Sequence, residues 1–321
     1  TTIYPGNSAN GGPHGHKHIA RLIDQLNPDL FLLVYDLIFA RFLLEALRHK
    51  KPGMIAGAYL ALDGRIVKRR KMIAPLKVLD FCVWYTDYAL EQVQHLLQEQ
   101  PSLLARPVDF RVIPHGVAAN TFYPLAEDDR ERRIMARQQV FPDLESPENT
   151  FIVLNGNTFS ARKRIDLTLR AFAQFAKNKS SQAVKLYLHK AFFKGEMSGE
   201  IISLVEELQL EPYLLCSPYN DQLTVDDSTM NLIYNACDVG INTCMGEGWG
   251  LVSCEHGATR AAQILPHHTV FPEIWQDHAA WVAPTETTEV GYTPHLMHQL
   301  KAEPFAEALE KLYTHQHLKD A

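Results

Sequence analysis

Two carboxylates, Glu247 and Glu255, are separated by seven residues in a glycine-rich stretch of the chain. The segment 238–242 just upstream, with Val239 and Ile241 at alternate positions, predicts a short buried strand, and residues 255–262 predict a helix that begins at Glu255. A glycine-rich loop between a strand and a helix N-terminus offers backbone N–H groups to an anion or to a sugar hydroxyl. Because the charge of Glu247 would repel a bare phosphate, the loop indicates a ligand with neutral hydroxyls beside its phosphate. That combination is typical of a nucleotide-sugar.

A basic triplet, Arg162, Lys163 and Arg164, begins the helix that we expect over residues 163–177. Cations at a helix N-terminus oppose the helix dipole, so a merely solvated run of charges would have an unfavourable position there. A bound diphosphate would offset that cost through charge-assisted hydrogen bonds. We therefore expect Lys163 first, and Arg162 next, to hold a diphosphate.

These motifs resemble the retaining glycosyltransferases of the GT-B fold, within the large glycosyltransferase family 4. The signature of that family has two glutamates separated by seven residues, with an aromatic residue, a glycine and a leucine between them. The residues that match it in register are Glu247, Trp249, Gly250, Leu251 and Glu255. Three further segments resemble family motifs in the expected order, over residues 112–124, 162–172 and 233–239.

The resemblance implies a role for each carboxylate and cation. Glu247 would accept hydrogen bonds from the hydroxyls of the transferred sugar, and Glu255 would grip the two ribose hydroxyls. Lys163, Arg162 and the backbone N–H groups of the loop would stabilise the leaving diphosphate, without a metal ion and without a cofactor. The plain alternatives are an exposed loop carboxylate at Glu247 and a dipole-favoured helix-start residue at Glu255. The other residues that we expect to bind the donor are Gly248, Trp249, Gly250, Leu251, Asn157, Arg164 and Ser217.

The N-terminal part of the chain carries weaker candidates. Asp36 follows an expected strand, where the family often has a polar residue on the acceptor side. Asp63 stands in an Asp-Gly pair that is either an acceptor loop or a plain turn. His115 lies at the expected domain junction, where a packed or exposed histidine is the default interpretation. Three alternating histidines within residues 14–18 have no accompanying carboxylate or cysteine, so we expect no metal site.

Strands alternate with helices along the whole chain, which predicts an α/β fold with parallel sheets. Together with the resemblance, this predicts GT-B: two Rossmann-like β/α/β domains that face each other across a cleft. We expect an N-terminal acceptor-side domain over residues 1–124 and a C-terminal nucleotide-sugar-binding domain over 125–300. A terminal helix within 301–321 would cross back to the first domain. Because the N-terminal domain of the family is usually longer, we expect this one to be either a natural short form or incomplete.

Several apolar runs predict individual strands. The continuous run 30–35 is typical of a parallel strand that is buried on both faces. Runs at 151–155, 184–188 and 214–217 predict strands of the second domain.

The composition of the chain limits the classes of partner and the cellular setting that we expect. Of the 321 residues, 46% are hydrophobic and 21% are charged, and the net charge of −6 argues against nucleic acid as a partner. Five scattered cysteines without a C-x-x-C pair favour a reduced, cytoplasmic setting. No apolar run reaches the roughly 18 residues that span a bilayer, so we expect membrane association to be peripheral at most. The expected partners are a nucleotide-sugar and an acceptor that is a saccharide, a lipid or a protein.

Two alternative functions remain open. The short first domain is also compatible with a non-catalytic or fragmentary nucleotide-sugar-binding module of the same fold. A Rossmann oxidoreductase fits poorly, because the glycines at 246–250 do not follow the G-x-G-x-x-G spacing and lie late in their domain.

Overall fold

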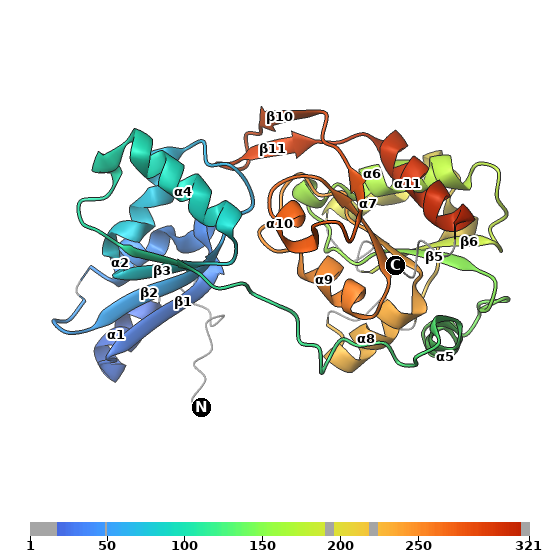
Figure 1. Cartoon of the computed structure of the whole chain (residues 1–321), viewed down its shortest axis with the longest axis horizontal. Helices are drawn as coiled ribbons and strands as arrows, with labels where there is room; N and C mark the ends of the chain where they lie inside the picture. The colour runs from blue at the N-terminus through green and yellow to red at the C-terminus, as the bar shows by residue number, and fades with distance from the viewer. Residues whose placement is uncertain (1–17, 49, 190–195, 218–223, 316–321) are drawn as a thin grey trace. The chain divides into compact units, whose positions relative to one another are not determined.

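The computed structural model describes residues 18–48, 50–189, 196–217 and 224–315 (Figure 1). The chain divides into two compact units. Unit 1 comprises Thr1–His115 and Glu289–Met297, and unit 2 comprises Gly116–Thr288 and His298–Ala321. Each unit is an α/β structure with a parallel sheet, which confirms the predicted fold class. None of the helices in the described ranges has the length and apolarity that a membrane crossing requires.

Unit 1 is built on a four-stranded sheet. Its helices and strands, in chain order, are α1 (Ile19–Leu26), β1 (Leu30–Asp36), the 3₁₀ helix η2 (Leu37–Phe42), α2 (Leu43–Ala46), β2 (Ile55–Ala61), α3 (Arg69–Ile73), η3 (Ala74–Val78), β3 (Phe81–Trp84), α4 (Asp87–Glu99), η4 (Pro101–Leu103) and β4 (Asp109–Val112). Two further strands, β10 (Glu286–Glu289) and β11 (Leu296–Gln299), pair with each other where the chain passes between the units.

The four strands of unit 1 lie side by side in chain order, all parallel (Figure 1). Crossovers between parallel strands are almost always right-handed, so a sheet that grows in one direction receives all its crossover helices on one face. The core of unit 1 agrees with helices on one face, because it contains alternate residues of the strands, which lie on the same face of the sheet. Those from β2 and β3 are Ala56, Ala58, Leu60, Cys82 and Trp84.

The other face of this sheet is exposed along β1 and at the start of β2, which corrects one prediction. Leu30, Leu32 and Val34 of β1 are 54%, 51% and 54% exposed, and Ile55 of β2 is 50% exposed. The sequence predicted that β1 is buried on both faces, since most parallel strands are. The prediction was wrong because strand order, rather than the composition of β1, decides which faces receive helices.

Unit 2 contains the larger sheet. Its helices and strands are α5 (Asp129–Val140), β5 (Phe151–Asn155), η5 (Ala161–Lys163), α6 (Ile165–Ala176), β6 (Val184–Leu188), α7 (Glu196–Glu207), η6 (Glu211–Tyr213), α8 (Asp227–Ala236), β7 (Val239–Ile241), α9 (Leu251–Ala258), β8 (Ala262–Pro266), α10 (Phe271–Trp275), β9 (Ala280–Val282) and α11 (Ala302–Thr314). The predicted strand 214–217 is reduced to a single bridge at Leu214.

The sheet of unit 2 has the parallel order β6-β5-β7-β8-β9, so its direction of growth reverses once. The reversal puts helices on both faces. Phe151 and Val153 of β5 belong to a core cluster with α6, whereas Ile152 and Leu154 belong to a second cluster with α8. The site residues described below therefore lie in a unit that is packed on both sides.

The unit boundaries differ from the expected domain boundaries. Phe122 is buried in the core of unit 2, and the Tyr123 N–H donates to the Asn231 side chain at 3.1 Å, so the segment before residue 124 belongs with unit 2. Helix α11 packs on α6 and belongs to unit 2, and its crossing to the first domain stays a prediction. The segment that returns to unit 1 is 289–297.

Candidate active site

The loop between β7 and α9 carries Glu247 and is buried throughout. Residues 242–250 are all buried, although they form neither helix nor strand. A buried loop must satisfy its backbone polar groups within the protein. The Cys244 N–H donates to the Asn242 side chain at 3.1 Å, and the Met245 N–H donates to the Arg162 carbonyl at 2.9 Å. The loop is therefore tied to the segment that carries the basic triplet.

Helix α9 begins at Leu251, four residues earlier than predicted. Its N-cap, Gly250, has a φ of 86°, and a Cβ at this position would lie 2.7 Å from the Phe271 ring. Only glycine combines this left-handed backbone with so close an approach. Glu255 accordingly lies in the second turn of the helix, so a helix-start role no longer explains why an acid stands there.

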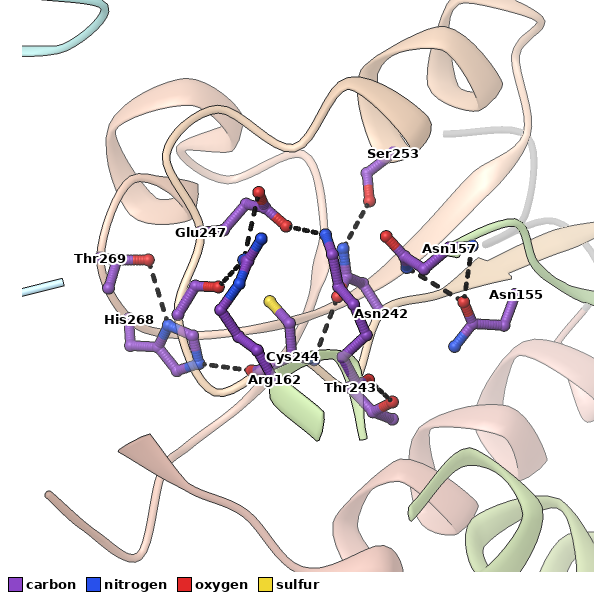
Figure 2. Close-up of polar contacts among 12 residues, drawn as sticks. Asn155, Asn157, Arg162, Asn242, Thr243, Cys244, Glu247, Ser253, His268 and Thr269 are labelled. Carbon is purple, nitrogen blue, oxygen red and sulfur yellow. Dashed lines mark hydrogen bonds and ion pairs between the residues drawn. The ribbon is translucent and has the colours of Figure 1, made fainter. Parts of the chain in front are cut away.

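The Glu247 carboxylate lies between the two cations that were expected to hold a diphosphate (Figure 2). Its Oε2 forms an ion pair with Lys163 Nζ, and its Oε1 lies 3.5 Å from Arg162 Nη1. Burial raises the pKa of Glu247, but the charges of Lys163 and Arg162, together with hydrogen bonds from Lys163 and the Gly248 N–H, outweigh burial and lower it to about 2. The carboxylate is therefore ionised at neutral pH, and it can only accept hydrogen bonds.

The basic triplet is divided between two partners. Helix α6 begins at Ile165, two residues later than predicted, and Arg164 precedes it with a φ of 50°. The Arg164 guanidinium donates to both carboxylate oxygens of Asp166, at 2.9 Å each from Nε and Nη2. Arg162 and Lys163 are thus the two members of the triplet that lie at Glu247, whereas Arg164 lies at Asp166.

A chain of buried side chains holds the backbone next to Lys163. Asn155 donates to Thr168 Oγ1 at 2.8 Å, and the hydroxyls of Thr168 and Thr243 lie 2.8 Å apart. The Thr243 hydroxyl in turn lies 3.0 Å from the carbonyl oxygen of Lys163 and 2.8 Å from that of Arg164. Sequence analysis missed these three side chains. The available signal was a polar residue within an otherwise apolar strand or helix face.

Two further donor-site candidates lie against neighbouring side chains. Asn157 is buried, and both its backbone N–H and its side-chain amide donate to Asn155 Oδ1, at 3.1 and 3.0 Å. Ser217 Oγ lies 2.9 Å from Tyr187 Oη. Asn157 therefore joins the network beside Lys163, whereas Ser217 contacts the hydroxyl of a β6 residue.

Glu255 is oriented by helix α8. Its Oε2 accepts a hydrogen bond from Tyr234 Oη at 2.8 Å, and the Tyr234 ring stacks on His256 with centroids 5.5 Å apart. Burial raises the pKa of Glu255, and the hydrogen bond from Tyr234 opposes that rise. Burial, followed by the charges of Glu247 and Glu255, raises the pKa of Cys254 to about 12, so both carboxylates lie near this one thiol.

The remaining loop candidates differ in exposure. Gly248, Trp249 and Gly250 are buried, whereas Leu251, the first residue of α9, is 44% exposed. An exposed apolar residue at a helix N-terminus can contact a ligand that approaches the free N–H groups of the first turn.

The unit 1 candidates lie at one edge of its sheet. Asp36 is the last residue of β1, and Asp63 follows the end of β2. The carboxyl ends of parallel strands form the usual ligand-binding edge of such sheets. His115 stacks on Tyr85, with ring centroids 4.7 Å apart and planes 6° apart, and burial lowers its pKa. His115 is otherwise exposed, so it agrees with the default interpretation of a packed or exposed histidine.

We expected no metal site at the three alternating histidines near the N-terminus. His18 directly precedes α1, and His14 and His16 lie outside the described residues. Within the described ranges, no group of three or more His, Cys, Asp or Glu side chains could hold a metal ion.

Comparisons with known proteins show the fold. The sequence matches no protein-family model and no curated protein. The α,α-trehalose 6-phosphate synthase of Burkholderia multivorans matches 95% of this chain with 69% of its own, at 14% identity and a TM-score of 0.66. The sucrose-phosphate synthase of Thermosynechococcus elongatus matches 99% of this chain with 73% of its own, at 17% identity and a TM-score of 0.69.

A third structure, of trehalose-6-phosphate from E. coli bound with UDP-2-fluoro glucose, matches 95% of this chain with 71% of its own, at 15% identity and a TM-score of 0.63. At such identities the likeness concerns the fold alone. It confirms the predicted α/β fold with parallel sheets, of the GT-B type.

Proposed function

We propose that this chain binds a nucleoside diphosphate-sugar and transfers the sugar to a hydroxyl acceptor, with retention at the anomeric carbon. The observation that carries the proposal is the buried, ionised Glu247 between Arg162 and Lys163, in a glycine-rich loop before helix α9. Two cations beside an acceptor-only carboxylate suit a ligand that combines a diphosphate with neutral hydroxyls. Membership of glycosyltransferase family 4 stays a prediction from the resemblance.

The cations would act on the leaving group. Negative charge develops on the diphosphate as the glycosidic bond breaks, and preorganised positive groups stabilise that charge. Lys163 is mostly buried, with 15% of its side chain exposed, so its interaction with a phosphate would be screened less than at the surface. The free N–H groups in the first turn of α9 would add to this stabilisation.

The two carboxylates would bind the hydroxyl groups of the donor. Glu247 would accept hydrogen bonds from the hydroxyls of the transferred sugar, and Glu255, oriented by Tyr234, would accept them from the ribose. In the family that this chain resembles, a phosphate oxygen of the leaving group takes the acceptor's proton. The proposal therefore requires no separate base, metal ion or cofactor. Asp36 and Asp63 would lie on the acceptor side.

The direct test is donor binding followed by turnover. UDP-glucose is the first donor to try, because a similar structure holds UDP-2-fluoro glucose. A thermal-shift panel should include GDP- and ADP-sugars, since a ligand at about 100 times its dissociation constant adds about 2.7 kcal/mol of stability. We expect one donor class to stabilise the wild type and to stabilise Glu247→Gln less. No stabilisation by any of these donors would contradict the proposal.

Turnover separates the enzyme from a non-catalytic binding module of the same fold. Release of the nucleoside diphosphate in the presence of a mixture of hydroxyl acceptors would support transfer, and NMR of the product would report its anomeric configuration. EDTA should leave this activity nearly unchanged. Strong inhibition by EDTA that Mn²⁺ reverses would contradict the metal-independent part of the proposal.

A further inference from the structure

His268 holds the backbone of the Glu247 loop from the turn that follows β8 (Figure 2). Its Nε2 lies 2.9 Å from the carbonyl oxygen of Cys244. Because a carbonyl oxygen can only accept, this ring nitrogen carries the proton. The opposite nitrogen, Nδ1, lies 3.2 Å from Thr269 Oγ1, whose hydroxyl can donate to it. Burial, with the nearby His298 as the second cause, lowers the pKa of His268 to about 3, so the ring is neutral at neutral pH.

The next two carbonyls of the loop are held as well. The backbone N–H of His298 donates to the Met245 carbonyl at 2.8 Å, and the Arg162 guanidinium donates to the Gly246 carbonyl. The rings of His298 and His268 stack, with centroids 4.5 Å apart and planes 10° apart. Donors from three separate segments thus fix three successive carbonyls, which leaves little backbone freedom to the residue that follows them.

We propose that His268 is a positioning residue for Glu247: its hydrogen bond to the Cys244 carbonyl keeps the carboxylate where the transferred sugar binds. The inference rests on the proposed function of Glu247. Arg162 also pairs with Glu247 itself, and His298 acts through its backbone N–H. His268 is therefore the anchor that a side-chain substitution can remove by itself.

Two substitutions separate the hydrogen bond from the ring. His268→Asn places its amide nitrogen near the position of Nδ1, too short to reach Cys244, whereas His268→Gln extends an amide N–H toward the position of Nε2. His267→Asn is the matched control, because the His267 ring is exposed and makes a T-shaped contact with the Trp281 ring, with centroids 5.0 Å apart. Should His268→Asn not fold, His268→Met fills the space of the ring without an N–H donor.

The measurements are kcat with the sugar donor and the dissociation constant of bare UDP. We expect His268→Asn to lower kcat roughly 10- to 100-fold, the scale for a catalytic group displaced by about 1 Å. UDP affinity should stay within about threefold, since the side chains expected at the diphosphate and at the ribose belong to η5 and α9 rather than to the loop segment that His268 holds. His268→Gln should recover most of the activity, and His267→Asn should behave as the wild type.

Equal kcat values for His268→Asn and His267→Asn would overturn the inference. So would a loss of UDP affinity in proportion to kcat, because that pattern indicates general damage to the site. If the wild type binds and turns over no nucleotide-sugar, the proposed function fails separately. Hydrogen exchange at residues 245–248 then decides the positioning role, since faster exchange in His268→Asn than in His267→Asn supports it and equal exchange contradicts it.

Discussion

Lys163 and Glu247 form a direct ion pair, which joins the cation expected on the diphosphate to the carboxylate expected on the sugar. Only 15% and 10% of the two side chains are exposed. Removing Lys163 would leave the buried Glu247 carboxylate with Arg162 alone, at 3.5 Å, and a buried charge that loses its closest partner costs more than the pair contributes. The same contact therefore couples the stability of the site to its chemistry.

Lys163→Ala should impair both properties. We expect kcat/KM to fall roughly 10²–10³-fold, as for the loss of one preorganised electrostatic group. We also expect the free energy of unfolding to fall by about 1–3 kcal/mol, somewhat less than for a fully buried pair. Steady-state kinetics and urea unfolding measure the two effects.

The double variant Lys163→Ala/Glu247→Gln should recover most of the lost stability but none of the activity, because it removes the buried carboxylate that has lost its closest partner. Arg164→Ala is the matched control within the triplet, since its guanidinium pairs with Asp166. A double variant no more stable than Lys163→Ala would show that the ion pair does not couple the two residues.

Glu255→Ala and Glu247→Ala should separate nucleotide binding from sugar transfer. Glu255→Ala should weaken the binding of bare UDP, because the proposed ribose contact is lost. Glu247→Ala should depress turnover while UDP affinity stays nearly intact, because Glu247 is assigned to the sugar. Calorimetry with UDP and kinetics with the sugar donor distinguish them. The same pattern in both variants would mean that one of the two roles is assigned wrongly.

Acid should destabilise the protein through its buried histidines. Burial lowers the pKa of His256 and of His268 from 6.5 to about 3. Their contribution to the free energy of unfolding is therefore complete above pH 6.5 and is lost as the pH falls toward 3. In that range the free energy of unfolding should fall by about 1.4 kcal/mol per pH unit for each histidine. Glu247, lowered from 4.5 to about 2, loses its contribution in the same direction below pH 4.5.

Urea unfolding between pH 5.5 and pH 4 checks this slope. His256→Gln and His268→Gln should each reduce the slope of the free energy of unfolding against pH by about the contribution of one histidine. His267→Gln, at an exposed position next to His268, is the control. A slope unchanged by both buried substitutions would contradict the assignment of neutral histidines.

The open face of the unit 1 sheet predicts a contrast between two leucines. Leu32 of β1 is 51% exposed, whereas Leu60 of β2 is fully buried. Leu32→Lys should change the free energy of unfolding by less than about 0.5 kcal/mol, the range for surface substitutions. Leu60→Ala should cost about 2–5 kcal/mol through lost burial and a cavity. Comparable large losses in both variants would mean that the face is covered in solution.

The sequence by itself determined the features that depend on neighbouring residues. Strands β5 and β6 have the predicted bounds, because short apolar runs indicate buried parallel strands wherever they pack. The spacing of Glu247 and Glu255, the glycines around them and the basic triplet are likewise local. They were sufficient to locate the candidate site and to predict the α/β fold.

Only the tertiary structure decided which of these groups meet. Lys163 and Glu247 are 84 positions apart, and their contact depends on how β5, β7 and the loops after them pack. The open face of β1 follows from strand order, which no single run of residues encodes. His268 looks like its exposed neighbour His267 in the sequence, and only burial beside the Cys244 carbonyl distinguishes it. Long-range packing selects these contacts, because local periodicity determines how a segment folds and not which segment lies against it.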